Sequence, residues 1–147
     1  MTQDSAIGSG DFDIGSLDAT ASATFNVAVI EDANGDPKSG FIIVSKNSPQ
    51  FQEAAHKIRV EGLVRASKRK AAIDTASKEG AEVMANAINA NDLLLAVSVV
   101  TGWFGFANNG QQAEFDAAIA KQMLTKFPTW RQKVLDELEK DANFIKG

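Results

Sequence analysis

Near the N-terminus the apolar positions alternate with a period of two, which is typical of a β-strand. The alternation places Phe25, Val27 and Val29 on one side of an extended segment. Turn-favouring residues fill positions 31–40, and a second β-branched run follows them. This pattern predicts a β-hairpin over residues 24–45. Because an isolated hairpin is only marginally stable in water, we expect its apolar face to pack on helices or on another subunit.

Beyond the hairpin the apolar spacing changes to three and four residues, the period of an amphipathic helix. Ser48 and Pro49 begin the first helix, with the serine as N-cap and the proline at the first helical position. We expect this helix to reach about Ala76 and to carry one apolar stripe. The residues of the stripe are Phe51, Ala54, Ala55, Ile58, Gly62 and Leu63. A further helix from Asp92 to Val100 is apolar almost all round, which predicts that it occupies the centre of the core.

Two more amphipathic helices are predicted near the C-terminus. Large apolar residues repeat every four positions from Phe115 to Phe127, and a similar repeat begins at Trp130. Pro128 marks a tight corner between the two helices. The pair Thr129 and Gln132 suggests a capping box at the start of the second helix.

These elements predict an α+β fold, mainly α, in which the N-terminal hairpin precedes a compact bundle of four to five helices. At 147 residues the chain has the size of one domain, which we place at residues 23–147, with 24–45 as the hairpin and 48–147 helical. Residues 101–110 combine three glycines with three aromatic residues and predict a structured loop. Residues 1–22 are rich in Gly, Ser, Asp and Ala, so we expect a flexible acidic arm.

The composition excludes several kinds of chemistry. The chain has no cysteine, no tyrosine and one histidine, which removes disulfides and thiolate metal sites and most imidazole catalysis. Its formal net charge of −4 disfavours binding to nucleic acid or to an anionic membrane. The N-terminus has no secretory signal pattern, and the longest apolar run, Leu93 to Val97, is too short to cross a bilayer. We therefore expect a soluble intracellular protein that is not an enzyme and needs no cofactor.

Isolated polar motifs have ordinary structural interpretations. His56 has no second histidine to act with, so we expect an exposed residue on the surface of the first helix. The turn at 32–36 resembles the start of a calcium loop, but Gly35 and Ile43 do not fit the sixth and twelfth positions of such a loop. We therefore interpret this segment as a hairpin turn.

A basic cluster lies near the end of the first predicted helix. It has no interleaved aromatic residue on which a base could stack, so we expect a solvated helix face or a contact with an acidic partner. The cluster consists of Arg65, Lys68, Arg69 and Lys70. Gly102, Gly105 and Gly110 lack the spacing of a phosphate-binding loop, which argues against nucleotide binding.

The aromatic residues Trp103, Phe104 and Phe106 form the most distinctive group in the chain. We expect Trp103 to close the core, and Phe104 and Phe106 cannot both point inward beside it. An aromatic patch left outside offers a docking place for an apolar helix.

The order of these pieces resembles that of the tail assembly chaperones of long-tailed bacteriophages. The resemblance covers about residues 24–144 and rests on the succession of elements. These are the hairpin with Phe25-Asn-Val-Ala-Val-Ile-Glu-Asp and Asn34-Gly35-Asp36-Pro37, the helix after Asn47-Ser48-Pro49, the apolar helix ending in Thr101-Gly102-Trp103, and the corner at Phe127-Pro128 before a final helix that ends near Phe144.

The resemblance implies a non-enzymatic assembly factor in the cytoplasm of an infected bacterial host. Such proteins bind the tape measure protein, whose apolar helices would otherwise aggregate, and leave as the tail tube assembles around it. The tail tube protein and further copies of the chain are additional candidate partners. We expect the client-binding groove to combine residues 102–106 with the stripe of the first helix. Its residues are Phe51, Ile58, Trp103, Phe104 and Phe106.

Two other classes of function stay open at this point. A small structural tail or connector component, retained in the virion, would use the hairpin and the arm to extend a neighbour's sheet. An enzyme or a nucleic-acid-binding protein is the third class, and the composition argues against it.

Overall fold

The computed structural model describes residues 14–17, 22–69 and 72–145. The expected acidic arm at 1–22 lies mostly outside these residues. The fold is α+β and mainly helical, as predicted. Its elements in chain order are η2 (Ile14–Ser16), β1 (Thr24–Glu31), β2 (Pro37–Val44), α2 (Pro49–Lys68), α3 (Lys78–Val99), β3 (Val100–Phe104), β4 (Ala107–Asn108), β5 (Gln111–Gln112), α4 (Ala117–Lys126), α5 (Pro128–Leu138) and η3 (Asp141–Asn143).

The predicted hairpin is confirmed as the antiparallel pair β1 and β2, in which Val27 lies opposite Phe41. The turn between them is closed by its own hydrogen bonds, as expected for a hairpin turn. The Asp32 carboxylate accepts from the backbone N–H groups of Asn34 and Asp36 at 2.9 and 3.0 Å. Gly35 takes a φ of +84°, a conformation that glycine adopts without steric cost.

A third strand, β3, corrects the prediction that residues 101–110 form a loop within an all-helical segment. β3 pairs antiparallel with β2 and places Trp103 opposite Phe41, so the sheet order is β1-β2-β3. Of the glycines that favoured a loop, only Gly102 lies within β3, where it pairs with Ile42 and a Cβ atom would come within 3.3 Å of the Ile42 side chain. Strand formation here depends on a partner edge distant in sequence, which local composition does not reveal.

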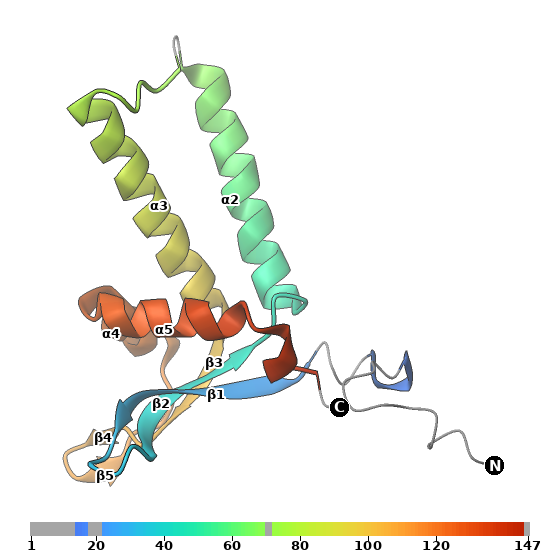
Figure 1. The fold of residues 1–147 in the computed structure, drawn as a ribbon, viewed down its shortest axis with the longest axis vertical. Helices are drawn as coiled ribbons and strands as arrows, with labels where there is room; N and C mark the ends of the chain where they lie inside the picture. The colour runs from blue at the N-terminus through green and yellow to red at the C-terminus, as the bar shows by residue number, and fades with distance from the viewer. Residues whose placement is uncertain (1–13, 18–21, 70–71, 146–147) are drawn as a thin grey trace.

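Helices α4 and α5 cover one face of this sheet (Figure 1). The core between the layers is formed by the inward residues of β1 and β2, the C-terminal end of α3 and the inner faces of α4 and α5. Its fully buried side chains include Phe41, Ile43, Val99, Leu124, Val134 and Leu138. The centre of the core therefore lies at the base of α3, in agreement with the apolar pattern around Val97.

Helices α2 and α3 form an antiparallel hairpin that projects from the sheet and its covering helices (Figure 1). α2 ends at Lys68 rather than near Ala76, and α3 begins at Lys78 rather than at Asp92. The early start of α3 has a local cause, because the Ser77 hydroxyl caps the helix by accepting from the Gly80 N–H at 3.0 Å. The predicted helix from 92 to 100 is thus only the last part of a 22-residue helix.

The predicted corner between the two C-terminal helices is confirmed, because α4 ends at Lys126 and α5 begins at Pro128. The predicted capping box is wrong. The N-cap of α5 is Phe127, which makes no side-chain capping bond, and the Gln132 amide instead donates to the Asp136 carboxylate at 2.8 Å. Proline at the first helical position already lacks one of the N–H groups that a cap would satisfy.

Phe144 follows η3 and packs edge-on against Phe25 of β1, with ring centroids 6.2 Å apart. The contact ties the last described turn of the chain to the start of the sheet.

Within the ranges that the structure describes, none of the helices combines the length and apolar character that a membrane span requires.

Candidate functional site

A groove lies between the short β4–β5 ribbon and helix α4. The chain reaches it through a tight turn at Gly105, whose φ is +74°. A Cβ atom at this position would lie 1.9 Å from the Lys38 carbonyl oxygen, so only glycine fits. The Ser39 hydroxyl donates to the Gly105 carbonyl at 2.8 Å and holds the turn against β2. The turn directs Phe106 toward Phe41, with the two ring centroids 5.5 Å apart.

The β4–β5 ribbon forms the outer wall of the groove. Asn109 and Gly110 both have positive φ and form the two-residue turn that hairpins of this kind favour. The Ala113 N–H donates to the Phe106 carbonyl at 2.9 Å, which continues the pairing beyond β5. The ribbon is therefore fixed at its tip by turn chemistry and at its base by a backbone hydrogen bond.

Trp103 is the fixed inner wall of the groove. Its side chain is buried, and its indole N–H donates to the Ala113 carbonyl at 2.9 Å. The ring also contacts Phe106 and Phe115 edge-on, with centroids 5.6 and 5.1 Å away. These contacts hold the indole in one orientation, so the apolar surface that it offers is preorganised.

The groove has a volume of about 600 Å³. Beside the inner wall of Trp103, its floor is apolar and consists of Phe106 and two α4 residues, Ile119 and Met123. Ile119 is 45% exposed although it lies beside buried rings, so its apolar surface is open to solvent. The rim is polar and is formed by Asn108, Gln111, Gln112, Glu114 and Asp116.

The rim carries two carboxylates and no basic residue among the side chains that line the groove. One of them, Asp116, also caps α4 and accepts from the N–H groups of Ala118 and Ile119 at 2.9 and 3.3 Å. An apolar floor with an acidic rim suits large apolar side chains flanked by basic ones.

The structure brings together only some of the residues predicted for the client groove. Trp103 and Phe106 line it. Phe104 lies on the opposite face of the sheet, because neighbouring strand residues point to opposite sides, and it packs over Gly40. Phe51 lies at a separate cavity of about 240 Å³ with residues of α3 and α5, and Ile58 is half-buried further along α2. The expected continuous groove from residues 102–106 to the α2 stripe is therefore not formed.

Ile119 and Met123 are the groove residues that sequence reasoning did not select. Their signal was present, because both belong to the four-residue repeat that predicts α4. The repeat indicates an apolar face, and it does not indicate whether that face is covered.

The remaining sequence candidates are on the surface. His56 is exposed on α2, and Arg65, Lys68 and Arg69 are exposed at its C-terminal end. Lys70 lies outside the described residues. In the described parts of the chain, no group of three or more His, Cys, Asp or Glu residues is arranged to hold a metal ion.

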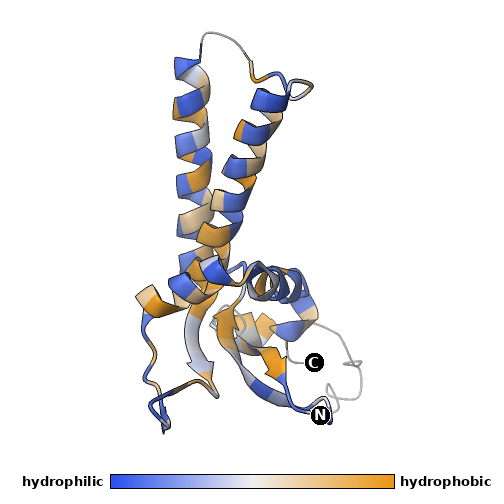
Figure 2. Cartoon of the chain, turned by 90° about the vertical axis from the view of Figure 1, so that its left-hand side faces the viewer, coloured by the Kyte–Doolittle hydropathy of each residue, from blue (hydrophilic) through white to orange (hydrophobic). Residues whose placement is uncertain are grey.

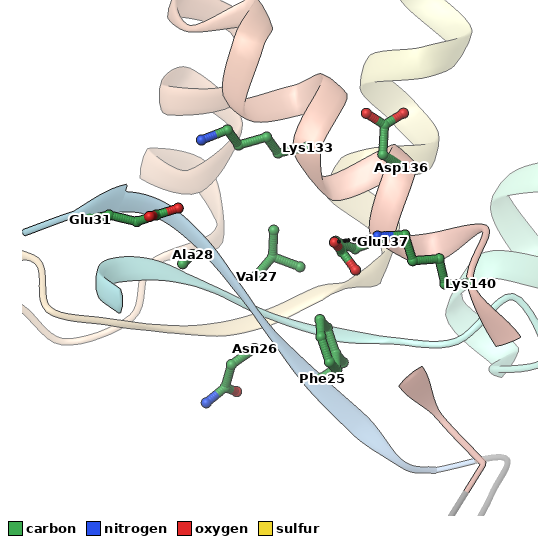
Figure 3. A pocket seen from close by; sticks show the side chains of 9 residues that line it. All are labelled: Phe25, Asn26, Val27, Ala28, Glu31, Lys133, Asp136, Glu137 and Lys140. Atoms are coloured by element: carbon green, nitrogen blue, oxygen red, sulfur yellow. Dashed lines mark hydrogen bonds and ion pairs between the residues drawn. The ribbon is translucent and has the colours of Figure 1, made fainter. Parts of the chain in front are cut away.

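A second cavity of about 420 Å³ lies between strand β1 and helix α5 (Figure 3). Val27 points toward α5 and Asn26 points away from it, as expected for adjacent strand residues. The Lys140 ammonium pairs with the Glu137 carboxylate at 2.9 Å, and the Asn143 amide donates to the same group at 2.8 Å. The hydrogen bond from Lys140 is the main cause that lowers the pKa of Glu137 below its ordinary value of 4.5.

Comparisons of the chain with protein-family models, with curated proteins and with solved structures find no match. The resemblance to tail assembly chaperones therefore stays a prediction.

Proposed function

We propose that this chain is a tail assembly chaperone of a long-tailed bacteriophage, acting in the cytoplasm of the infected bacterium. It binds apolar helices of the tape measure protein, keeps that protein soluble, and leaves as the tail tube assembles. The observation that carries the proposal is the preorganised groove over Trp103 and Phe106, with the open side chain of Ile119 beside them. The order of sequence elements supports the same function.

The volume of the groove suits two neighbouring side chains from one turn of a client helix. Apolar residues three or four positions apart project from the same side of a helix, so two of them can enter a groove of about 600 Å³ together. Burying two large apolar side chains contributes about 3–6 kcal/mol. Association costs about 4 kcal/mol or more, so a single site binds weakly.

Weak individual sites fit a chaperone that must be released. Many copies can cover the apolar stretches of a long helical client, and each copy is displaced when a tube subunit offers a larger contact. The carboxylates of Glu114 and Asp116 at the rim favour client segments in which Lys or Arg flanks the apolar anchors.

The test is co-expression with the tape measure protein of the same phage, comparing Ile119→Ser with Ile30→Ser. Both isoleucines are partly exposed, at 45% and 36%, and Ile30 lies on β1 outside the groove. Serine and isoleucine have similar helix propensities, so the change at 119 alters the groove more than the stability of α4. The proposal expects the soluble fraction of the client to fall with Ile119→Ser and to stay at the wild-type level with Ile30→Ser. Equal client solubility with both variants would contradict it.

A structural tail or connector component retained in the virion is the second candidate. The observation that favours it is the edge position of β1, which pairs only with β2 among the described residues and lines a cavity together with residues of α5. An extended segment of a neighbouring subunit could add to this edge. Quantitative detection of the chain in purified particles would favour this candidate, and its absence there would favour the chaperone.

A further inference from the structure

Asparagine followed by glycine occurs twice in the chain, and each pair lies in a hairpin turn. Asn34-Gly35 is in the turn between β1 and β2, and Asn109-Gly110 is in the turn between β4 and β5. Both turns lie at the end of the molecule opposite the tip of the α2–α3 hairpin (Figure 1), where Figure 2 shows hydrophilic segments. The two asparagines are exposed. The pair is chemically reactive because glycine has no side chain to shield its backbone nitrogen from the neighbouring side-chain amide.

The reaction between these two groups needs only water. The glycine nitrogen loses its proton to solvent and forms a bond to the side-chain amide carbon of the asparagine, and ammonia leaves, so that a cyclic imide remains. Water then opens the ring at either of its carbonyl groups. One opening gives aspartate, and the other gives isoaspartate, in which the main chain runs through the side-chain carbons. In both products the side-chain NH₂ group has been replaced by OH.

The two turns differ in the state of the glycine N–H that must react. The Gly35 N–H donates to the Asp32 carbonyl at 3.0 Å, so this bond must break before the nitrogen can attack. The Gly110 N–H makes no hydrogen bond to any of the described residues. A Cβ atom at Gly110 would meet nothing within 4 Å, so the space around this residue is open to solvent. The attacking nitrogen is therefore free at Gly110 and engaged at Gly35.

Charge separates the two turns in the same direction. Attack requires a deprotonated nitrogen, and nearby negative charges oppose the formation of an anion. A Cβ atom at Gly35 would lie 3.8 Å from the Glu31 carboxylate, and Asp32 and Asp36 belong to the same turn. The residues that pair in the β4–β5 ribbon are all uncharged. They are Ala107, Asn108, Gln111 and Gln112.

The β4–β5 ribbon also opens more easily than the β1–β2 hairpin. β4 and β5 have two residues each and, among the described strands, pair only with each other. β1 and β2 have eight residues each, and β2 also pairs with β3. Short surface elements open locally at low free-energy cost. Opening lets the asparagine side chain and the glycine nitrogen approach each other, which a closed turn hinders.

We propose that Asn109 is the site at which this chain deamidates, through attack of the Gly110 nitrogen on its side-chain amide, and that the β1–β2 turn protects Asn34. A hydrogen bond of typical strength that must break first slows a reaction by about two- to tenfold. The carboxylates and the longer strands slow the reaction at Asn34 further. This inference does not depend on the function proposed above.

Deamidation at Asn109 alters the outer wall of the groove, because the neighbouring ribbon residues line its rim. Aspartate places a further carboxylate beside a rim that already carries two. Isoaspartate adds a methylene group to the main chain within a two-residue turn, so the pairing of Asn108 with Gln111 no longer closes. The modified chain therefore has a more acidic rim or a loosened ribbon.

The test follows deamidation of the full chain by mass spectrometry during incubation at physiological temperature and mildly alkaline pH. Trypsin cleaves after Lys and Arg, so Asn34 falls in the peptide 1–38 and Asn109 in the peptide 79–121. Fragmentation of each peptide locates the modified residue, and endoproteinase Asp-N, which cleaves before aspartate and not before isoaspartate, separates the products. We expect Asn109 to react at least about threefold faster than Asn34. Equal rates, or faster modification of Asn34, would overturn the proposal.

The same chain unfolded in guanidinium chloride is the control for local sequence. Both asparagines precede glycine, so we expect their rates to converge once the turns are lost. A preference for Asn109 that persists unchanged in denaturant would overturn the protection assigned to the fold.

Two variants test the named groups, with circular dichroism as the check that each is folded. Asn109→Gln lengthens the amide side chain, which disfavours ring closure, so the fast modification of peptide 79–121 should disappear. Asp32→Ala removes the carboxylate that accepts from the Asn34 and Asp36 N–H groups at 2.9 and 3.0 Å. Asn34 should then react faster, while Asn109 keeps its wild-type rate. Fast modification that survives Asn109→Gln, or an unchanged Asn34 rate in Asp32→Ala, would contradict the proposal.

Discussion

Replacing Trp103 with phenylalanine tests whether the inner wall of the groove is held as the structure indicates. The indole N–H donates to the Ala113 carbonyl at 2.9 Å, and this bond joins β3 to the segment that leads into α4. Phenylalanine keeps an apolar ring and removes both the donor and part of the buried surface.

The expected loss of stability can be worked from these two changes. The lost hydrogen bond contributes about 0.5–1.5 kcal/mol. Phenylalanine has three fewer side-chain heavy atoms than tryptophan, and burial of that much apolar surface contributes about 2 kcal/mol. The free energy of unfolding should therefore fall by about 3 kcal/mol, which for a chain of this length lowers Tm by about 10 °C.

Urea unfolding measures this change, and Trp130→Phe is the matched control. Trp130 is half-buried, and its indole donates no hydrogen bond to another described residue. It stacks on Phe127 with ring centroids 4.2 Å apart, so its loss is expected to be about half as large. Because the chain has two tryptophans, each variant retains a single fluorophore that reports unfolding. Equal losses for both variants, or a loss below about 1 kcal/mol for Trp103→Phe, would refute the role assigned to the hydrogen bond.

Three further variants test the backbone and the charges. Gly105→Ala should destabilise the fold by more than about 2 kcal/mol, because φ is +74° and the added Cβ atom would lie 1.9 Å from the Lys38 carbonyl oxygen. A thermal unfolding midpoint close to that of the wild type would contradict this. Gly62→Ala should instead stabilise α2 by about 0.5–1 kcal/mol, because the new methyl group meets nothing within 4 Å, and a lower Tm would count against it. Glu137→Gln should lower the free energy of unfolding at neutral pH, and the difference from wild type should shrink on acidification. The pKa of Glu137 is lowered in the folded state, so its ionised carboxylate stabilises the fold fully above the ordinary value of 4.5. This stabilisation is lost as the pH falls through the folded-state pKa. Urea unfolding as a function of pH checks this, and a difference from wild type that does not depend on pH would contradict the assignment.

The hairpin and the C-terminal helices could be predicted from the sequence because their signals are local. Alternation at Phe25, Val27 and Val29 and the four-residue repeats around Pro128 require no knowledge of the rest of the chain. Strand β3 could not be predicted, because its pairing partner lies about sixty residues earlier and the glycines in and directly after it, Gly102 and Gly105, favour a loop.

The start of α3 and the floor of the groove were missed for different reasons. Residues 78–91 are rich in alanine and asparagine, and their few large apolar residues form no continuous stripe, so the helical period is weak there. The floor residues Ile119 and Met123 lie on a stripe that was predicted. Their accessibility depends on how far the β4–β5 ribbon stands from α4, which is a property of tertiary packing.

The most direct test of the account is site-specific photo-cross-linking in cells that co-express the chain and its tape measure protein. A photoreactive phenylalanine analogue is placed at Ile119 in the groove or, as the control, at Ile30 on β1. We expect a cross-link to the tape measure protein from position 119 and none from position 30. A complex that forms without any cross-link from 119, or with equal cross-links from both positions, would contradict the claim that this groove binds the client.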